Sequence, residues 1–166
     1  MRLDVEPMLI DYKLIDQFKK DKNVESLLRG FLWQLAHITQ ACQGIVYEVK
    51  LLNENLPQAV FSSAFAFSNP NLKDLRYSKG EGFVGQVLQD KKEIIVTNIP
   101  ADYLTIVSGL GKSEPAYLII IPLMSEEENL FAIIELASFI PFDNNLAGMV
   151  SKAGNKLYEL INNLHG

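Results

Sequence analysis

Two nearly unbroken apolar runs in the C-terminal half of the chain, residues 116–123 and 129–137, constrain its fold most strongly. Each has the length of a strand, and the polar stretch 125–129 between them suits a hairpin turn. Strands that are apolar on both sides belong to a sheet with both faces covered. The sequence therefore predicts an antiparallel hairpin in a sheet that carries helices on one face and other chain segments on the opposite face.

Further strands are expected ahead of this hairpin. Residues 44–50 alternate apolar and polar side chains, and residues 59–67 come after a turn, which predicts a second hairpin. Residues 93–98 predict another strand. The loop 68–79 and the connection 99–111, with a helical turn at Tyr103–Val107, are left to fold over one face of the sheet, where a pocket would lie.

Long helices are predicted from apolar residues at three- and four-residue spacing. We expect helices over residues 23–41 and 143–164 to pack side by side on the outer face of the sheet. The first of them has a stripe of large apolar residues expected to be buried: Val24, Leu27, Leu28, Phe31, Leu35 and Ile38. A further helix over residues 5–19 is apolar on two sides and so needs two partners, of which one could be a second subunit or an adjoining domain.

The far side of the 23–41 helix carries Trp33, next to Gly30 and His37. A partly exposed tryptophan on a polar helix face is one interpretation; a protein interface is the other, because interfaces are enriched in Trp. We expect a homodimer interface that contains these three residues together with Ile10 and Leu14 of the first helix.

Length and charge limit the classes of function. The 166 residues suit one domain over residues 22–166, preceded by a helix and linker over residues 1–21. A net charge of −5 argues against binding to nucleic acid, and no apolar run reaches the length of a membrane span. Cys42 is the only cysteine, which excludes a disulfide within the chain and fits the cytoplasm.

A glycine motif, Gly80-x-Gly82-x-x-Gly85, matches the dinucleotide fingerprint, but its context excludes that function. The preceding residues 74–79 are too polar for the central parallel strand that a dinucleotide site requires. A protein kinase also has a glycine-rich loop of this kind, but the further motifs that a kinase needs do not occur downstream. Residues 83–88 instead have the spacing of a short helix. We expect the first two glycines to form the turn before this helix and Gly85 to allow a close approach of backbone or ligand.

Together with four motifs further along the chain, this segment resembles the core motif of a GAF domain, a sensory and regulatory module. The matching residues, which lie in an order and spacing typical of the family, are Gly80-Glu-Gly-Phe-Val-Gly-Gln, Thr97-Asn-Ile-Pro-Ala-Asp-Tyr, Ser108-Gly-Leu-Gly, Ile119-Ile-Ile-Pro-Leu and Ile133-Ile-Glu-Leu-Ala-Ser-Phe. The resemblance covers residues 22–163. It implies an α+β, PAS-related fold with a central antiparallel sheet of five to six strands, long helices on one face, and short helices and loops over the pocket face.

The pocket is expected between the central strands and this covering layer. Its ligand-binding residues are expected to be Phe83, Ile99, Tyr103, Ser108, Gly109, Leu110, Gly111 and Glu135. Glu135 is the one acid in an apolar strand, and alternation places it on the face of Phe131, Ile133 and Ala137. It either contacts a ligand or bonds to the loop at 103–111. The backbone N–H groups around Ser108 suit a small organic ligand with one acidic or carbonyl group.

Residues for catalysis are scarce. His37 and His165 fall on an outer helix face and in the tail, and Cys42 lies among small and apolar residues, so we expect no enzyme, no metal and no cofactor. Family members that reduce free methionine sulfoxide use several cysteines, which this chain lacks. Two hypotheses stand: a sensory domain that binds a small molecule and signals through dimer helices to a histidine kinase or another output, as in two-component systems, or a dimerisation or interaction domain with a self-filled pocket.

Overall fold

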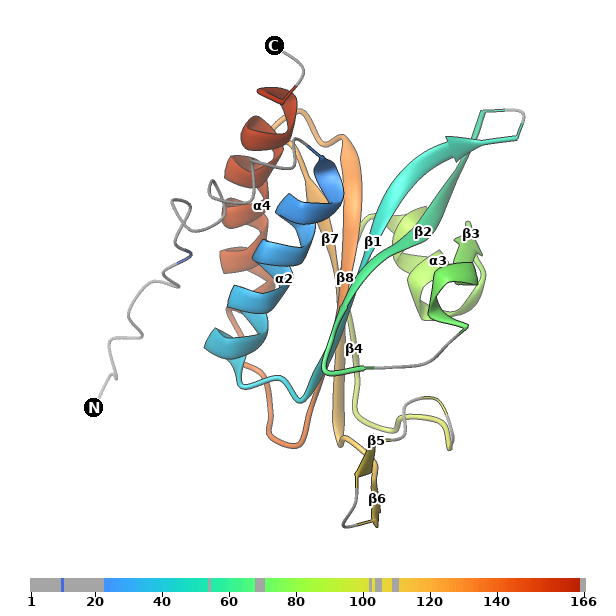
Figure 1. The fold of residues 1–166 in the computed structure, drawn as a ribbon, viewed down its shortest axis with the longest axis vertical. Coiled ribbons are helices and arrows are strands. Elements are labelled where there is room, and N and C mark those ends of the chain that lie inside the picture. The colour runs from blue at the N-terminus through green and yellow to red at the C-terminus, as the bar shows by residue number, and fades with distance from the viewer. Residues whose placement is uncertain are drawn as a thin grey trace.

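The computed structural model describes residues 10, 23–53, 55–67, 71–101, 103, 106–108 and 111–164, without the side chains of residues 106–108 and 111–113. These residues form a six-stranded antiparallel sheet with the strand order β3-β2-β1-β8-β7-β4. Helices α2 (Val24–Thr39) and α4 (Leu146–Asn162) lie side by side on one face, and α3 (Gly82–Asp90) lies on the other (Figure 1). This is the predicted α+β architecture.

Two hairpins build the centre of the sheet. Strands β1 (Gln43–Leu52) and β2 (Leu56–Phe65) form the first, and β7 (Tyr117–Met124) and β8 (Leu130–Ser138) form the second. Pairing of β1 with β8 joins them, while β3 (Arg76–Ser78) and β4 (Ile94–Val96) are the edge strands beside β2 and β7. Both predicted hairpins and the strand predicted at 93–98 are confirmed.

The helix side of the sheet holds the larger hydrophobic core. The α2 helix begins after Asn23, whose side chain accepts a hydrogen bond of 2.7 Å from the Ser26 amide. The α4 helix approaches β7 closely at Gly154, where an added Cβ would lie 3.3 Å from Leu123. The core members from the sheet and helices are Leu27, Leu28, Phe31, Leu32, Leu35, Val46, Ile119, Ile121, Leu123, Ile134, Leu136, Leu146, Val150, Leu157 and Ile161.

The burial of α2 differs from the prediction in one respect. Ile38, expected inside, is 43% exposed, whereas Leu32 and Ala36 are buried. The first half of the helix is buried on nearly all sides, and the exposed large residues lie in its second half. Ile10 belongs to the same core, so chain that precedes the helix contributes to its cover. The helix predicted over residues 5–19 lies, apart from Ile10, outside the described residues.

The opposite face of the sheet packs against α3. Its core contains Ile45 and Tyr47 of β1, Ile133 and Ala137 of β8, and the apolar side of α3. Phe131 does not share this face, contrary to the predicted alternation, and packs against Tyr158 of α4 with ring centroids 5.1 Å apart. The pairing of β7 with β8 shifts register between Leu123 and Met124, and this irregularity interrupts the alternation at the start of β8.

Two connections are more regular than expected. The predicted loop 68–79 contains a 3-10 helix η2 (Leu72–Asp74) and strand β3. The helical turn predicted at Tyr103–Val107 is wrong for its last residues, because Ile106 and Val107 belong to strand β5 (Ile106–Ser108), which pairs with β6 (Gly111–Ser113). Both corrections concern three-residue strands, which are too short to show the two-residue period that identifies a strand in sequence. No helix of the described residues is long and apolar enough to cross a membrane.

The glycine motif forms the turn before α3. Gly80 and Gly82 have φ angles of 81° and 62°, which side chains rarely adopt. The Gly80 amide donates to the Gly85 carbonyl oxygen over 2.9 Å, and a Cβ at Gly85 would clash with the Ser78 carbonyl oxygen. The close approach expected at Gly85 is confirmed, and the approaching group is backbone.

Replacing Gly85 with alanine tests this packing. Gly85→Ala is expected to lower the free energy of unfolding by about 2 kcal/mol, because overpacked sites displace rigid backbone. The matched control is Gly148→Ala in α4, where an added Cβ would meet nothing within 4 Å. That variant should be as stable as wild type or up to about 1 kcal/mol more stable, since alanine favours helix. Urea denaturation measures both; an unchanged Gly85→Ala midpoint would contradict the close approach.

Candidate functional site

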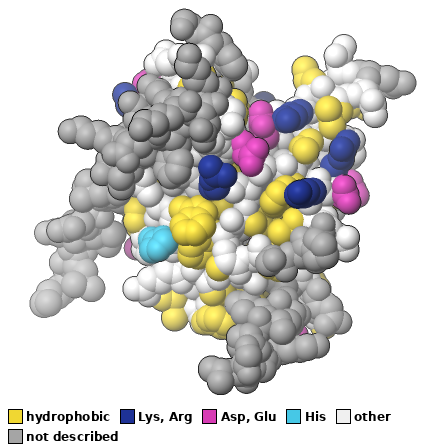
Figure 2. All heavy atoms as spheres, viewed as in Figure 1, with side chains coloured by type: hydrophobic (Ala, Val, Ile, Leu, Met, Phe, Trp, Pro, Cys, Tyr) yellow, Lys and Arg dark blue, Asp and Glu magenta, His cyan; other side chains and the backbone are white. Residues whose placement is uncertain are grey.

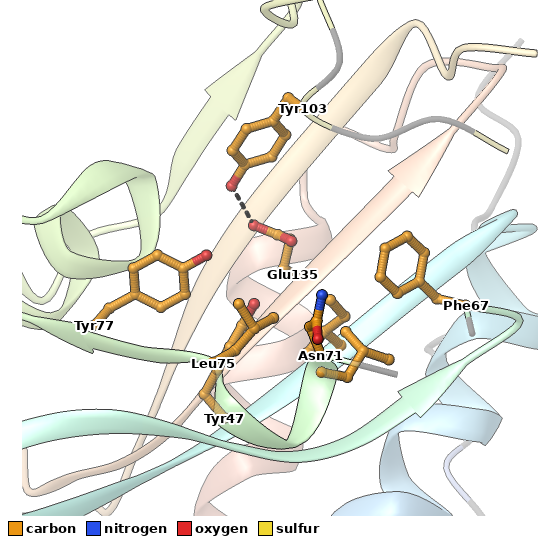
Figure 3. A pocket seen from close by; sticks show the side chains of 9 residues that line it. Tyr47, Phe67, Asn71, Leu75, Tyr77, Tyr103 and Glu135 are labelled. Atoms are coloured by element: carbon orange, nitrogen blue, oxygen red, sulfur yellow. Dashed lines mark hydrogen bonds between the residues drawn. The ribbon is translucent and has the colours of Figure 1, made fainter. Parts of the chain in front are cut away.

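A cavity of about 180 Å³ lies on the α3 side of the sheet (Figure 3). Its floor comes from β1 and β8, and its walls come from Phe67, from residues 71–77 and from Tyr103. The lining side chains are Ile45, Tyr47, Phe67, Asn71, Leu72, Leu75, Tyr77, Tyr103 and Glu135. An apolar cavity of about 150 Å³ holds benzene, so this one suits a small organic molecule.

A buried acid is the chemical centre of the cavity. Glu135 is 4% exposed, and its Oε2 accepts a hydrogen bond of 2.8 Å from the Tyr103 hydroxyl (Figure 3). Burial raises the pKa of Glu135 to about 7, while the hydrogen bond from Tyr103 opposes this rise. The carboxyl group is therefore divided between its acid and carboxylate forms near neutral pH.

Three tyrosine hydroxyls surround this acid. Burial, and then the negative charge of Glu135, raise the pKa of Tyr47, Tyr77 and Tyr103, so all three stay protonated. The rings of Tyr47 and Tyr77 meet edge to face with centroids 5.6 Å apart. The cavity thus combines aromatic walls with hydroxyl groups and one ionisable group.

The structure brings only some of the predicted ligand-binding residues to the cavity. Tyr103 and Glu135 line it, as expected from the sequence. Phe83 packs behind Tyr103 with ring centroids 5.3 Å apart, and Ile99 packs against the α3-side core, so neither belongs to the lining. Ser108 and Gly111 pair in the β5–β6 hairpin. Gly109 and Leu110 lie outside the described residues. Ligand contact by any of these residues stays a prediction.

The loop 68–79 was expected to cover this face of the sheet, but the wall residues that it contributes at 71–77 were not predicted individually from the sequence. Its position depends on β3, which pairs with β2 so that Tyr77 lies opposite Ala59. The Phe61 amide also donates to the Leu75 carbonyl oxygen over 3.0 Å. These contacts hold Leu72, Leu75 and Tyr77 against the floor of the cavity. The available signal was the presence of three large apolar or aromatic residues in a stretch otherwise typical of a loop.

The groups needed for covalent catalysis are not gathered here. Among the lining residues that the structure describes there is no Ser, Thr, Cys, His or Lys. The Cys42 thiol donates to the Ala137 carbonyl oxygen over 3.2 Å, and burial raises its pKa, so it is a poor nucleophile. In the part of the chain that the structure describes, no three His, Cys, Asp or Glu residues are grouped as a metal site requires. The arrangement suits binding.

A second feature is an aromatic cluster on the outer surface of α2, formed by Trp33, His37 and Phe65. Trp33 is 48% exposed, and its ring meets Phe65 edge to face at 5.1 Å and stacks on His37 at 6.4 Å. Figure 2 shows the hydrophobic patch beside a histidine on this face. Of the other residues expected at a dimer interface, Gly30 and Ile10 are buried within the chain, and Leu14 lies outside the described residues.

The chain belongs to the GAF domain family, whose model matches residues 21–147. Its fold is similar to that of the GAF domain of a phosphoenolpyruvate-protein phosphotransferase from Coxiella burnetii, with a TM-score of 0.66, 16% identity and coverage of 98% of this chain and 96% of that chain. The corresponding domain from Acinetobacter has a TM-score of 0.68 and 12% identity, with 99% and 96% covered.

Enzymes share this fold as well. A free methionine-R-sulfoxide reductase from Neisseria meningitidis, solved with its substrate, has a TM-score of 0.61 and 14% identity, with 92% of this chain and 90% of that chain covered. Sequence comparison with curated proteins gives no match. At identities this low, the similarity establishes a common fold, and the function has to be inferred from the residues of the site.

The buried acid predicts a pH dependence of stability. The pKa of Glu135 is about 7 in the folded chain and ordinarily 4.5, so the folded state holds the proton more tightly. The stabilisation by this proton is complete below pH 4.5 and is lost as the pH rises through 7. This loss amounts to up to about 3 kcal/mol of the free energy of unfolding. The Glu135→Gln side chain is neutral at every pH, so this variant should not show the loss.

Urea denaturation of wild type and Glu135→Gln across this pH range measures the difference. The free energy of unfolding of the wild type should fall relative to that of the variant as the pH rises. Glu126→Gln, which changes an exposed glutamate in the β7–β8 turn, is the control and should follow the wild-type profile. Parallel profiles for wild type and Glu135→Gln would show that Glu135 does not hold its proton in the folded chain.

Proposed function

We propose that this chain is a non-catalytic sensory or regulatory domain that binds a small organic molecule in the cavity above β1 and β8. The observation that supports this most directly is the buried Glu135–Tyr103 pair at an open cavity. Ligand sites combine apolar walls with a few placed polar groups. A pocket filled by its own side chains, the alternative considered from sequence, would leave no such volume.

Energetics favour a ligand-binding role over a purely structural one. Side chains that filled a cavity of about 180 Å³ would make packing contacts that this arrangement forgoes. A buried acid adds a further cost unless it is neutral or well paired. Folded domains that keep both features near each other often do so at functional sites. Occupation by a ligand would recover part of this free energy.

Transmission of binding requires a connection to another surface. Adjacent residues of the central strands point to opposite sides: Glu135 faces the cavity, and Ile134 lies in the core under α2 and α4. We propose that a ligand shifts the packing of these helices and signals to a histidine kinase or another output in the cytoplasm. GAF domains occur in phosphotransferase and GAF/HD proteins, which supports a partner of this kind.

The non-catalytic part of the proposal rests on the lining residues. Free methionine-R-sulfoxide reductases show that the fold can host enzymes. This chain has one cysteine, and it is outside the lining. Reduction of free methionine sulfoxide by the purified protein, abolished by Cys42→Ser, would contradict the proposal.

A ligand screen with two variants tests the binding site. Compounds that raise the thermal midpoint of the wild type should bind Tyr103→Ala at least about tenfold more weakly, because that variant loses both a wall and a hydroxyl donor. Tyr158→Ala is the matched control, since Tyr158 packs on Phe131 at the helix side of the sheet. Calorimetric titration gives the affinities. If no compound binds, or if Tyr103→Ala binds as wild type does, this site assignment is wrong.

We propose homodimerisation through the aromatic cluster of Trp33, His37 and Phe65, because exposed aromatic clusters are typical of interfaces. Trp33→Ala should weaken association by about 2 kcal/mol, the scale of an interfacial hot spot. Leu51→Ala, which truncates a more exposed apolar residue on the β1–β2 hairpin, should leave association unchanged. Sedimentation equilibrium measures both, and a monomeric wild type at high concentration would refute the proposal.

A further inference from the structure

The aromatic residues of the cavity come from separate parts of the chain. Tyr47 lies on β1, Phe67 comes just after β2, Tyr77 lies on β3, and Tyr103 lies in the connection after β4. Figure 3 shows Tyr77 and Phe67 on opposite sides of Glu135, with Tyr103 bonded to the carboxyl group. Aromatic ring faces carry negative electrostatic potential and attract cations. Four rings around one small volume therefore favour a positively charged guest.

The polar groups of the cavity also favour a positively charged guest. Glu135 is the only acid or base with a full charge among the lining residues that the structure describes. Tyr103 donates to Oε2 of this carboxyl group, and a carboxylate has further lone pairs on its oxygens that can accept from a guest. No lysine, arginine or histidine of the described residues forms an ion pair with it. An anionic guest would meet this carboxylate and, among the described lining residues, no opposite charge.

We infer that the cavity selects a compact organic cation, such as a methylated ammonium group, held among the rings of Tyr47, Phe67, Tyr77 and Tyr103 with Glu135 as its counter-ion. This inference rests on the proposed ligand-binding function and names its ligand class. It differs from the sequence-based expectation of an acidic or carbonyl ligand, which placed the Ser108–Gly111 turn rather than Glu135 at the centre of recognition. A cavity of about 180 Å³ limits the guest to slightly more than the size of benzene.

Binding of a cation is coupled to ionisation of Glu135. Among the described lining residues, the titratable groups around this carboxyl are the hydroxyls of Tyr103, Tyr47 and Tyr77, and none of them is charged at neutral pH. Burial raises the pKa of Glu135 to about 7. A cation favours the carboxylate, so its binding releases a proton and its affinity rises with pH. The rise from about pH 6 to about pH 8 is expected to be about tenfold.

The test uses choline as probe and 3,3-dimethyl-1-butanol as its uncharged isostere, with binding to the whole chain measured by calorimetry and by amide chemical shifts. Choline is expected to bind and to shift amides of β1, β8 and residues 71–77, whereas the isostere binds at least about tenfold more weakly. Glu135→Gln should weaken choline binding at least about tenfold and remove its pH dependence. Glu126→Gln removes one negative charge at the surface, away from the cavity, and is the control for the change in net charge.

A second pair of variants separates the ring from its hydroxyl. Tyr103→Phe keeps the aromatic face and should bind choline within about threefold of wild type, whereas Tyr103→Leu should bind at least about tenfold more weakly. This pair decides the question if Glu135→Gln does not fold. Equal binding of choline and its isostere, equal binding by the two Tyr103 variants, or no binding of choline would overturn the cation inference. The proposed function survives these outcomes if another compound binds in the cavity, and fails with the inference if none does.

Discussion

The pairing of β1 with β8 is the contact on which the rest of the structure depends. Each strand belongs to its own local hairpin, and the register from Gln43–Ala137 to Glu48–Ala132 makes the two hairpins one sheet. Burial on both faces secures this register, because a slip of one residue would move Glu135 into the helix-side core and Ile134 into the cavity. The helices, α3 and the cavity all take their positions from this seam.

Glu135 shows how such a sheet can hold a chemical site. The strand around it is apolar, and the acid is tolerated because Tyr103 donates to it and because it keeps its proton more readily than an exposed glutamate. The same burial that destabilises the carboxylate would strengthen its attraction to a positively charged guest, since charges interact more strongly away from water. Keeping this acid buried therefore costs the domain some stability as the pH rises through 7.

The cavity could be predicted only in part, and particular residues show why. Glu135 was visible in the sequence because an acid interrupts an apolar strand, and Tyr103 was visible through the family resemblance. Leu75 and Tyr77 were not, because their places depend on the pairing of β3 with β2, a three-residue contact without a periodic pattern. Phe131 was assigned to the wrong face because strict alternation fails where β7 and β8 shift register.

The sequence by itself determined the local elements: two hairpins with their turns, the amphipathic helices α2 and α4, and a turn whose positive φ angles and tight backbone approach favour glycine. These elements depend on hydrophobic period and backbone sterics, which are properties of neighbouring residues. Only the tertiary structure decided which side chains enclose the cavity, how exposed Trp33 is, and how strongly Glu135 holds its proton. Those quantities depend on burial and on contacts between residues far apart in the chain, which no local pattern encodes.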